Sequence, residues 1–127
     1  FYDSGLNLPN NIEFHEWVSN VEILKFMSMS KTVLVPSRIE PYGCVVQEAL
    51  YSGSIPVVSD SAGAKSLKNL FNRMEIFTSS NYASFRASFV RALSYSADFN
   101  SHDLNSIKSF FSPLVGVNKL LHFIYKY

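Results

Sequence analysis

Cysteine is almost absent from this sequence. The one cysteine, Cys44, excludes an intrachain disulfide framework and a zinc site built from several cysteines. Charge is also sparse: charged residues make up 17% of the chain and the net charge is +1, which gives no electrostatic case for a nucleic-acid partner. No apolar run approaches the roughly 20 residues that a membrane-spanning helix needs. These absences leave a folded globular domain as the expectation.

The residues that are present favour one apolar domain. Hydrophobic residues make up 47% of the 127 residues and aromatic residues 15%, so we expect a single domain with a core rich in Phe and Tyr. The three histidines share no metal-ligand spacing and no Asp-x-Asp pair occurs, so we expect neither a metal nor a cofactor. Residues 1–60 are net negative and residues 61–127 net positive, but the basic residues form no polybasic run.

Apolar periodicity and turn-forming residues predict short alternating elements after a loop over residues 1–11. The expected strands are residues 12–18, Thr32–Val35, Ile55–Ser59 and residues 74–78. The expected helices are residues 21–29 (capped by Asn20), 43–52 (ended by Gly53), 65–71, 82–95, 104–111 and 114–125. Strands alternating with helices over short connections are typical of a doubly wound parallel sheet, so the predicted fold is α/β with three layers.

A loop over residues 36–43 leaves one predicted buried strand and enters the following helix. Ligands of parallel sheets bind at the carboxyl ends of the strands, where this loop lies. Gly43 at the helix start lets a ligand approach the backbone closely. The N–H groups of Gly43, Cys44 and Val45 would point at that ligand, with the helix dipole behind them. This segment therefore predicts an anion site suited to a phosphate.

Two carboxylates flank this predicted anion site. Glu40 lies in the loop, and Glu48 lies in the helix with its side chain leaning back toward the helix start. Glu48 falls outside the apolar arc of this helix, at the border between core and cleft. The arc contains Val45, Val46, Ala49 and Leu50. A carboxylate at that border can accept two hydrogen bonds from a vicinal diol, such as that of a ribose.

Glu40 and Glu48, with seven residues between them, resemble the E-x7-E signature of retaining glycosyltransferases with the GT-B fold, in glycosyltransferase family 4 (glycosyl group 1). Neighbouring segments resemble that family too: Pro36-Ser37, Pro41-Tyr42-Gly43, Glu48-Ala49, Ser52-Gly53 and Pro56-Val57-Val58. The resemblance is strong over residues 32–63 and weak over most of the remaining chain. The sequence departs from the family at Glu16, where glycine is common, and at residues 64–66, which lack a frequent acidic residue.

The resemblance implies a Rossmann-like sheet within the C-terminal, donor-binding domain of a GT-B enzyme. Residues 1–127 would be part of that domain, with the acceptor domain outside this chain, so we expect no catalysis by this chain alone. The implied reaction is metal-independent and moves a hexose-type sugar, with retention, from a nucleoside diphosphate to an acceptor hydroxyl. The implied acceptor is a glycan or lipid-linked glycan of polysaccharide or lipopolysaccharide assembly. The implied location is the cytoplasm, including peripheral contact with the inner membrane face.

The resemblance also implies roles for single residues. Glu40 matches the first glutamate, beside the transferred sugar, and is the candidate catalytic residue. Glu48 matches the second, which binds the donor ribose. The loop facing the sugar and diphosphate matches Tyr42, Gly43, Cys44 and Val45. Arg38 is a further candidate ligand of the phosphates, with a structural salt bridge as its alternative.

Two other functions remain open from the sequence. One is a non-catalytic module that binds a sugar nucleotide, and the other is a plain α/β interaction module. Two residues also have structural alternatives: Cys44 as a small packing residue, and Trp17 as a core side chain.

Overall fold

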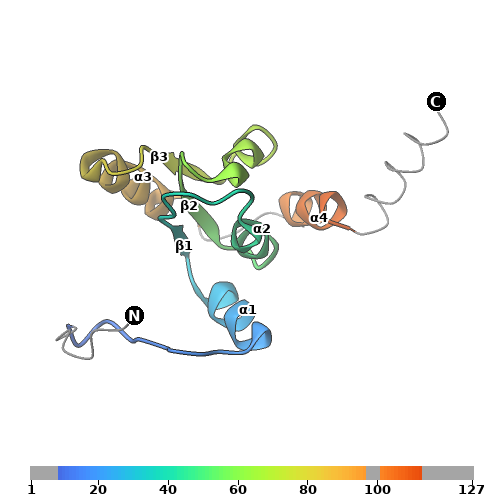
Figure 1. Cartoon of the computed structure of the whole chain (residues 1–127). Helices are drawn as coiled ribbons and strands as arrows, with labels where there is room; N and C mark the ends of the chain where they lie inside the picture. Colours follow the sequence, from blue (N-terminus) through green and yellow to red (C-terminus); the bar gives the residue numbers. More distant parts are fainter. Residues whose placement is uncertain (1–8, 97–100, 113–127) are drawn as a thin grey trace.

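The computed structural model describes residues 9–96 and 101–112, which form one parallel sheet with helices around it (Figure 1). In chain order the elements are α1 (Asn20–Met29), β1 (Thr32–Val35), α2 (Cys44–Tyr51), β2 (Ile55–Ser59), the 3-10 helix η1 (Gly63–Asn69), β3 (Glu75–Phe77), α3 (Tyr82–Ser94) and α4 (Ser101–Phe110). The alternation from β1 to β3 confirms the predicted α/β class.

The sheet has the strand order β1-β2-β3, and both pairings are parallel. Thr32 of β1 pairs with Ile55 of β2, and Val57 of β2 pairs with Glu75 of β3. All five residues of β2 are buried, as expected for the central strand of a sheet covered on both faces. The predicted strands Thr32–Val35 and Ile55–Ser59 are therefore confirmed, and the third strand is shorter than predicted.

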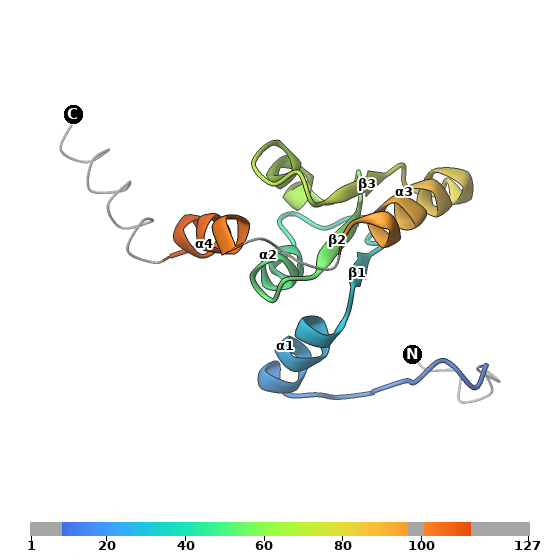
Figure 2. The ribbon, with the colours of Figure 1, turned by 180° about the vertical axis from the view of Figure 1, so that it is seen from behind.

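Successive residues of β2 point to opposite faces, and each face has its own core. The α2 face is built around Val58, which packs with side chains from α2, η1 and α4; its buried members include Val46, Leu50, Leu67, Met74 and Ile107. The α3 face is built around Val57, which packs with Ile55, Phe77 and Ala92. Figures 1 and 2 show α2 and α3 on opposite sides of β2. The predicted three layers are thus present.

The strand predicted over residues 12–18 does not form. This segment has no strand assignment, and Trp17 is 89% exposed. Alternating apolar residues form a strand only where a neighbouring strand accepts their backbone hydrogen bonds, and β1 pairs with β2 alone among the described residues. The expectation that Trp17 lies in the core is wrong for the same reason: nothing in the described part of the chain covers it.

Helix α1 begins one residue earlier than predicted, because its cap is Ser19 rather than Asn20. The Ser19 hydroxyl accepts from the Glu22 amide at 3.3 Å, and the Glu22 carboxylate accepts from the Ser19 amide at 2.9 Å. This reciprocal pair is a capping box. The Ser19 hydroxyl also donates to the Glu22 carboxylate at 2.7 Å, and the bonds that this carboxylate accepts from the Ser19 hydroxyl and amide hold the pKa of Glu22 below its ordinary value.

The remaining predicted helices differ from the observed ones mainly in where they begin and end. The helix predicted over residues 65–71 is the 3-10 helix η1, which begins two residues earlier. The helices predicted over residues 82–95 and 104–111 correspond to α3 and α4. Helix α2 is confirmed, and Gly53 follows it with a positive φ of 86°, the left-handed conformation common after helices. The helix predicted over residues 114–125 lies outside the described residues.

Candidate functional site

The loops that leave β1 and β2 are joined at the carboxyl edge of the sheet. Glu40 and Ala62 form an isolated parallel bridge, and the Gly63 amide donates to the Glu40 carbonyl at 2.8 Å. The backbone approach is so close that a Cβ on Gly63 would lie 1.9 Å from the carbonyl oxygen of Pro41. Position 63 therefore requires glycine, and the two loops are held in one geometry by their backbones.

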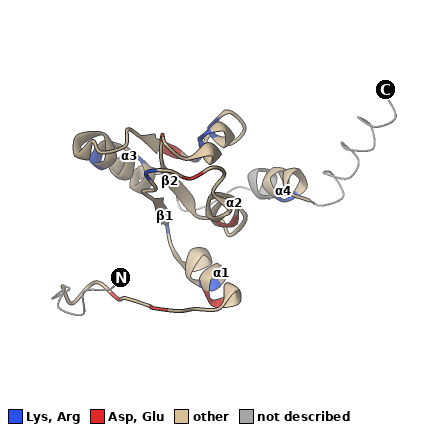
Figure 3. Cartoon of the chain, in the orientation of Figure 1, with Lys and Arg blue, Asp and Glu red and all other residues tan. Residues whose placement is uncertain are grey.

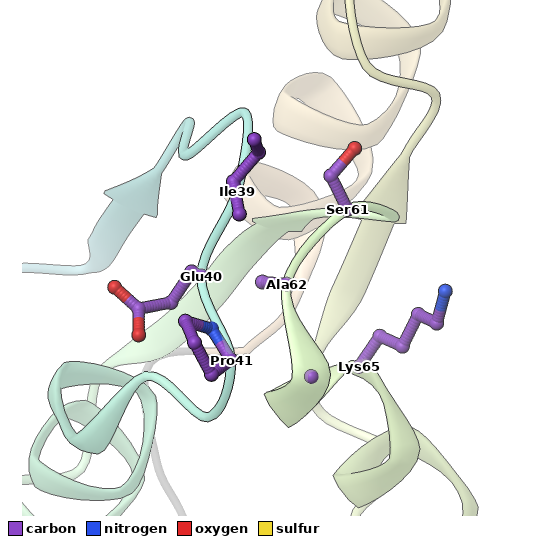
Figure 4. Close-up of a pocket in the computed structure, with 7 residues that line it drawn as sticks. Ile39, Glu40, Pro41, Ser61, Ala62 and Lys65 are labelled. Carbon is purple, nitrogen blue, oxygen red and sulfur yellow. The ribbon is translucent and has the colours of Figure 1, made fainter.

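A hollow of about 260 Å³ lies between these two joined loops. Its lining residues are Ile39, Glu40, Pro41, Ser61, Ala62, Gly63 and Lys65 (Figure 4). The carboxylate of Glu40 points toward the α2 side, whereas Lys65 rises from η1 on the opposite side. The hollow thus has one acidic and one basic residue in walls that come from different loops.

Glu40 lies directly over the start of α2. Gly43 is the N-cap of this helix with a φ of 81°, and a Cβ there would meet Cγ of Glu40 at 3.3 Å. Because Gly43 has no side chain, no side-chain oxygen caps the first turn of α2, and no acidic residue lies in that turn. The predicted arrangement of a loop carboxylate beside an uncapped helix start is present, with Cys44 and Val45 exposed in the first turn.

Glu48 is exposed on α2, outside the buried arc, as predicted. It lines a different hollow, of about 240 Å³, with Leu24, Gln47, Tyr51 and Phe111. Glu40 and Glu48 are therefore not brought into one pocket by the described part of the chain. Tyr42 links the two regions, because its hydroxyl accepts a hydrogen bond from the Gln47 amide.

The helical-wheel prediction for α2 is correct at three positions and wrong at one. Val46, Ala49 and Leu50 have no exposed surface, but Val45 is 43% exposed. Val45 lies in the first turn, two residues after Gly43, and is open to solvent there. This exposure fits a loop that faces a ligand better than a core position.

The structure settles two of the alternatives left by the sequence. Cys44 is exposed, so its interpretation as a small packing residue is wrong. Arg38 is exposed, and neither ion pair found among the described residues includes it, so no structural salt bridge accounts for it there. Both side chains thus remain accessible near the start of α2.

A third hollow, of about 330 Å³, lies near the carboxyl ends of β1 and β3. It is lined by Pro36, Phe77, Ser80, Asn81, Tyr82 and Phe85. The sequence analysis missed this hollow and missed Lys65, whose only sequence signal was its place in a small-residue loop after a buried strand. Loops that follow different strands become neighbours only through the sheet order, which no local pattern reveals.

Charge and metal chemistry are sparse over the part of the chain that the structure describes. Lys and Arg are spread over α1, η1, α3 and α4 and the loops between them rather than gathered on one surface (Figure 3). Within residues 9–96 and 101–112, no group of three His, Cys, Asp or Glu side chains is arranged to hold a metal ion. None of the described helices has the length and apolar content needed to cross a bilayer.

Comparison with known protein families shows which family the chain belongs to. Residues 3–98 match the model of the family described as Glycosyl transferases group 1, and no curated protein matches the chain. The match contains both candidate glutamates and all three strands. A three-stranded parallel sheet between helices is consistent with the Rossmann-like C-terminal domain of the GT-B fold, and the family implies a nucleotide-sugar donor. The chain therefore belongs to the glycosyl transferases of group 1.

Proposed function

We propose that this chain is part of the donor-binding domain of a retaining, metal-independent glycosyltransferase. The enzyme transfers a hexose-type sugar from a nucleoside diphosphate to a hydroxyl of a glycan or lipid-linked acceptor. The observation that carries the proposal is Glu40, which lies over the left-handed Gly43 at the uncapped start of α2 within a chain of this family. The acceptor domain would lie outside this chain.

The start of α2 suits the chemistry of the leaving group. As the bond from the sugar to the diphosphate breaks, negative charge grows on the diphosphate, and the helix dipole and first-turn amides stabilise it. No side chain of the described residues caps that turn, and Cys44 and Val45 are exposed there, so their N–H groups could meet a ligand, whereas Gly43 itself is buried. Tyr42, Cys44 and Val45 would line the donor here through their backbones, with Arg38 as an additional cation.

Glu40 is the candidate catalytic residue. Its side chain is half-buried between the loop and Gly43, and within the described residues it has no hydrogen bond or ion pair of its own. A carboxylate in this position would accept hydrogen bonds from the sugar hydroxyls. It would also stabilise the positive charge that develops on the sugar carbon when the diphosphate departs.

Glu48 would bind the ribose of the donor. It is exposed and lies four residues beyond Cys44, about 6 Å farther along the helix axis. Its hollow also contains Gln47, whose amide adds polar groups beside the carboxylate. The separation of the Glu40 and Glu48 hollows fits an extended donor, with the sugar in one and the nucleoside toward the other.

Calorimetric titration of the full-length protein with UDP, GDP and ADP tests this function. We expect one nucleotide to bind tightly and Glu48→Ala to weaken it about ten- to a hundred-fold, because a charge-assisted partner of the ribose is lost. Glu13→Ala removes another exposed carboxylate, outside the site, and is the control. Unchanged binding in Glu48→Ala would overturn the ribose assignment, and no binding of any nucleotide would favour the interaction module instead.

The wider setting of the reaction follows from the breadth of the family. We place the enzyme in polysaccharide or lipopolysaccharide assembly, in the cytoplasm or at the inner face of the membrane. Transfer of radiolabelled sugar to a lipid-linked oligosaccharide, measured with the full-length protein and isolated membranes, would support this setting. Activity on water-soluble acceptors alone would contradict the membrane part of the proposal.

A further inference from the structure

We propose that Lys65 binds an anionic group of the sugar-nucleotide donor. This inference rests on the proposed function. It concerns a residue that the E-x7-E segment does not contain and that lies in the loop following the next strand. The anionic group is either the diphosphate or a carboxylate on the transferred sugar, since an ammonium group recognises both.

Lys65 is positioned close to the candidate catalytic residue. It lines the same hollow as Glu40, although the two residues come from different loops. The bridge between Glu40 and Ala62 fixes the two loops side by side. Lys65 follows Ala62 by three residues, so the bridge also fixes its position relative to Glu40. Figure 4 shows the two side chains extending to opposite sides, so the acid and the base do not neutralise each other.

The hydrogen bonding of Lys65 leaves part of its ammonium group open to a ligand. Its Nζ donates to the carbonyl oxygen of Asp60 at 2.6 Å, which orients the side chain through a neutral group. An ammonium has three N–H donors, so this contact leaves two for a ligand. The carboxylate of Asp60 is directed elsewhere, because its Oδ1 accepts from the Ser79 amide at 2.9 Å. Neither ion pair among the described residues includes Lys65, so its positive charge has no protein counter-charge there.

Lys68, the second lysine of η1, differs from Lys65 in what it contacts. Nζ of Lys68 donates to the carbonyl of Asn72 at 2.8 Å and to that of Met74, and these bonds hold η1 against the start of β3. Lys68 does not line the Glu40 hollow. The two lysines therefore share a helix and a type of backbone contact, but only Lys65 lies where a donor would bind.

A sugar-nucleotide donor is anionic and would therefore be a ligand for the ammonium group of Lys65. Helix amides and basic side chains are the groups of this chain that could stabilise negative charge on a bound donor. Glu40 in the same hollow would suit the hydroxyls of the sugar, whereas Lys65 would suit an anion at the opposite wall. Because Lys65 is exposed, water screens this interaction, and we expect it to contribute about tenfold in affinity.

The test uses the full-length protein and the nucleoside diphosphate that binds in the titration above (UDP, GDP or ADP), with its hexose and hexuronate conjugates as further probes. Dissociation constants are measured for Lys65→Gln, Lys65→Arg and Lys68→Gln. We expect Lys65→Gln to weaken binding about tenfold and Lys65→Arg to recover most of the affinity, because the charge is restored. Lys68→Gln should leave the affinities unchanged.

The three probes separate the two sources of the anion. Equal weakening of all three by Lys65→Gln assigns Lys65 to the diphosphate, whereas weakening of the hexuronate conjugate alone assigns it to the sugar carboxylate. If the wild type binds and Lys65→Gln has no effect on any probe, this inference is overturned and the proposed function stands. Equal loss in Lys68→Gln would also overturn it, by tracing the effect to the stability of η1. If the wild type binds no nucleotide, the proposed function fails, and this inference fails with it.

Discussion

The two faces of the sheet hold their carboxylates in opposite ways. On the α3 face, Glu75 is 6% exposed; its Oε2 accepts from Nε of Arg91 at 2.9 Å and its Oε1 from the hydroxyl of Tyr95 at 2.7 Å. Near the α2 face, Glu40 and Glu48 have no side-chain partner within the described residues. A buried carboxylate with all its partners stabilises the fold, whereas an accessible one without partners is available to a ligand.

The α3 face is held by a continuous polar network. Arg91 donates a second bond to Oγ of Ser88 at 2.8 Å, and the Ser88 hydroxyl donates to the carbonyl of Ile76 at 2.8 Å. The network therefore joins α3 to β3 through side chains whose polar groups are paired. Burying Glu75 is tolerated only because these partners replace water.

The carboxyl edge near α2 is held by backbone contacts instead. The bridge at Ala62 and the close approach at Gly63 join two loops without using a charged side chain. The carboxylate of Glu40 and the ammonium of Lys65 are consequently left free of ion pairs with each other. The difference shows how one small sheet can be rigid on both faces while keeping charged groups for a ligand on one side.

Gly63→Ala gives the largest expected effect, because it breaks the backbone contact on the site side. A Cβ at 1.9 Å from the Pro41 oxygen cannot be accommodated without moving a loop. We expect the free energy of unfolding to fall by about 3 kcal/mol, at the upper end of the cost of overpacking. Urea unfolding followed by circular dichroism measures this change.

The effect of Gly63→Ala should reach the site as well as the fold. Nucleotide affinity, measured where the variant is still folded, should fall because Glu40 moves with its loop. Asn69→Ala, at an exposed position of η1, is the control and should change stability by less than about 0.5 kcal/mol. Wild-type stability in Gly63→Ala would show that the two loops are not held together as described.

Glu75→Gln and Glu48→Gln test the comparison of carboxylates directly. Glu75→Gln keeps the shape of the side chain but removes the charge that accepts from Arg91 and Tyr95. We expect a loss of about 2 kcal/mol, since bonds to charged groups contribute about 1.5–3 kcal/mol and Arg91 is partly solvated. Glu48→Gln should change the unfolding midpoint little and lower nucleotide affinity. Equal stability losses in the two variants would remove the distinction between the two faces.

Much of the fold could be predicted because the signals are local. The β-branched run of β1 and the apolar run of β2 predict buried strands, and the glycine after α2 ends that helix. The strand predicted over residues 12–18 failed because a strand depends on a partner that an alternating pattern does not specify. The Ser19 cap was missed although Glu22 lies three residues later, which is the spacing of a capping box.

The site was predictable where one segment contains it and unpredictable where several segments meet. Glu40, Gly43 and Glu48 lie in one strand–loop–helix unit, so their order along α2 follows from the sequence. Lys65 lines the same hollow as Glu40 only because β2 lies beside β1, which brings their following loops together. The Glu75 network has the same origin, since its members come from β3 and from the far end of α3.

Tyr95→Phe gives the smallest expected effect and shows whether the network on the α3 face acts as described. The hydrogen bond that Tyr95 donates to Glu75, together with burial, raises the pKa of the phenol above its ordinary value. The folded state therefore retains this proton more strongly than the unfolded state. The resulting stability is present below about pH 10 and is lost as the pH rises through the folded pKa.

Tyr95→Phe should accordingly cost about 1 kcal/mol near neutral pH, the usual net contribution of one hydrogen bond. Above about pH 10 the difference in stability between wild type and variant should shrink, because Tyr95 ionises freely in the unfolded wild type. In the folded wild type it cannot ionise without placing a phenolate beside Glu75. Urea unfolding of both proteins from about pH 8 to about pH 11 measures that difference, and lysine titration, common to both, cancels. A difference that stays constant over this range would mean that the phenol is not bonded to a buried carboxylate, and the contrast between Glu75 and the two site glutamates would lose its chemical basis.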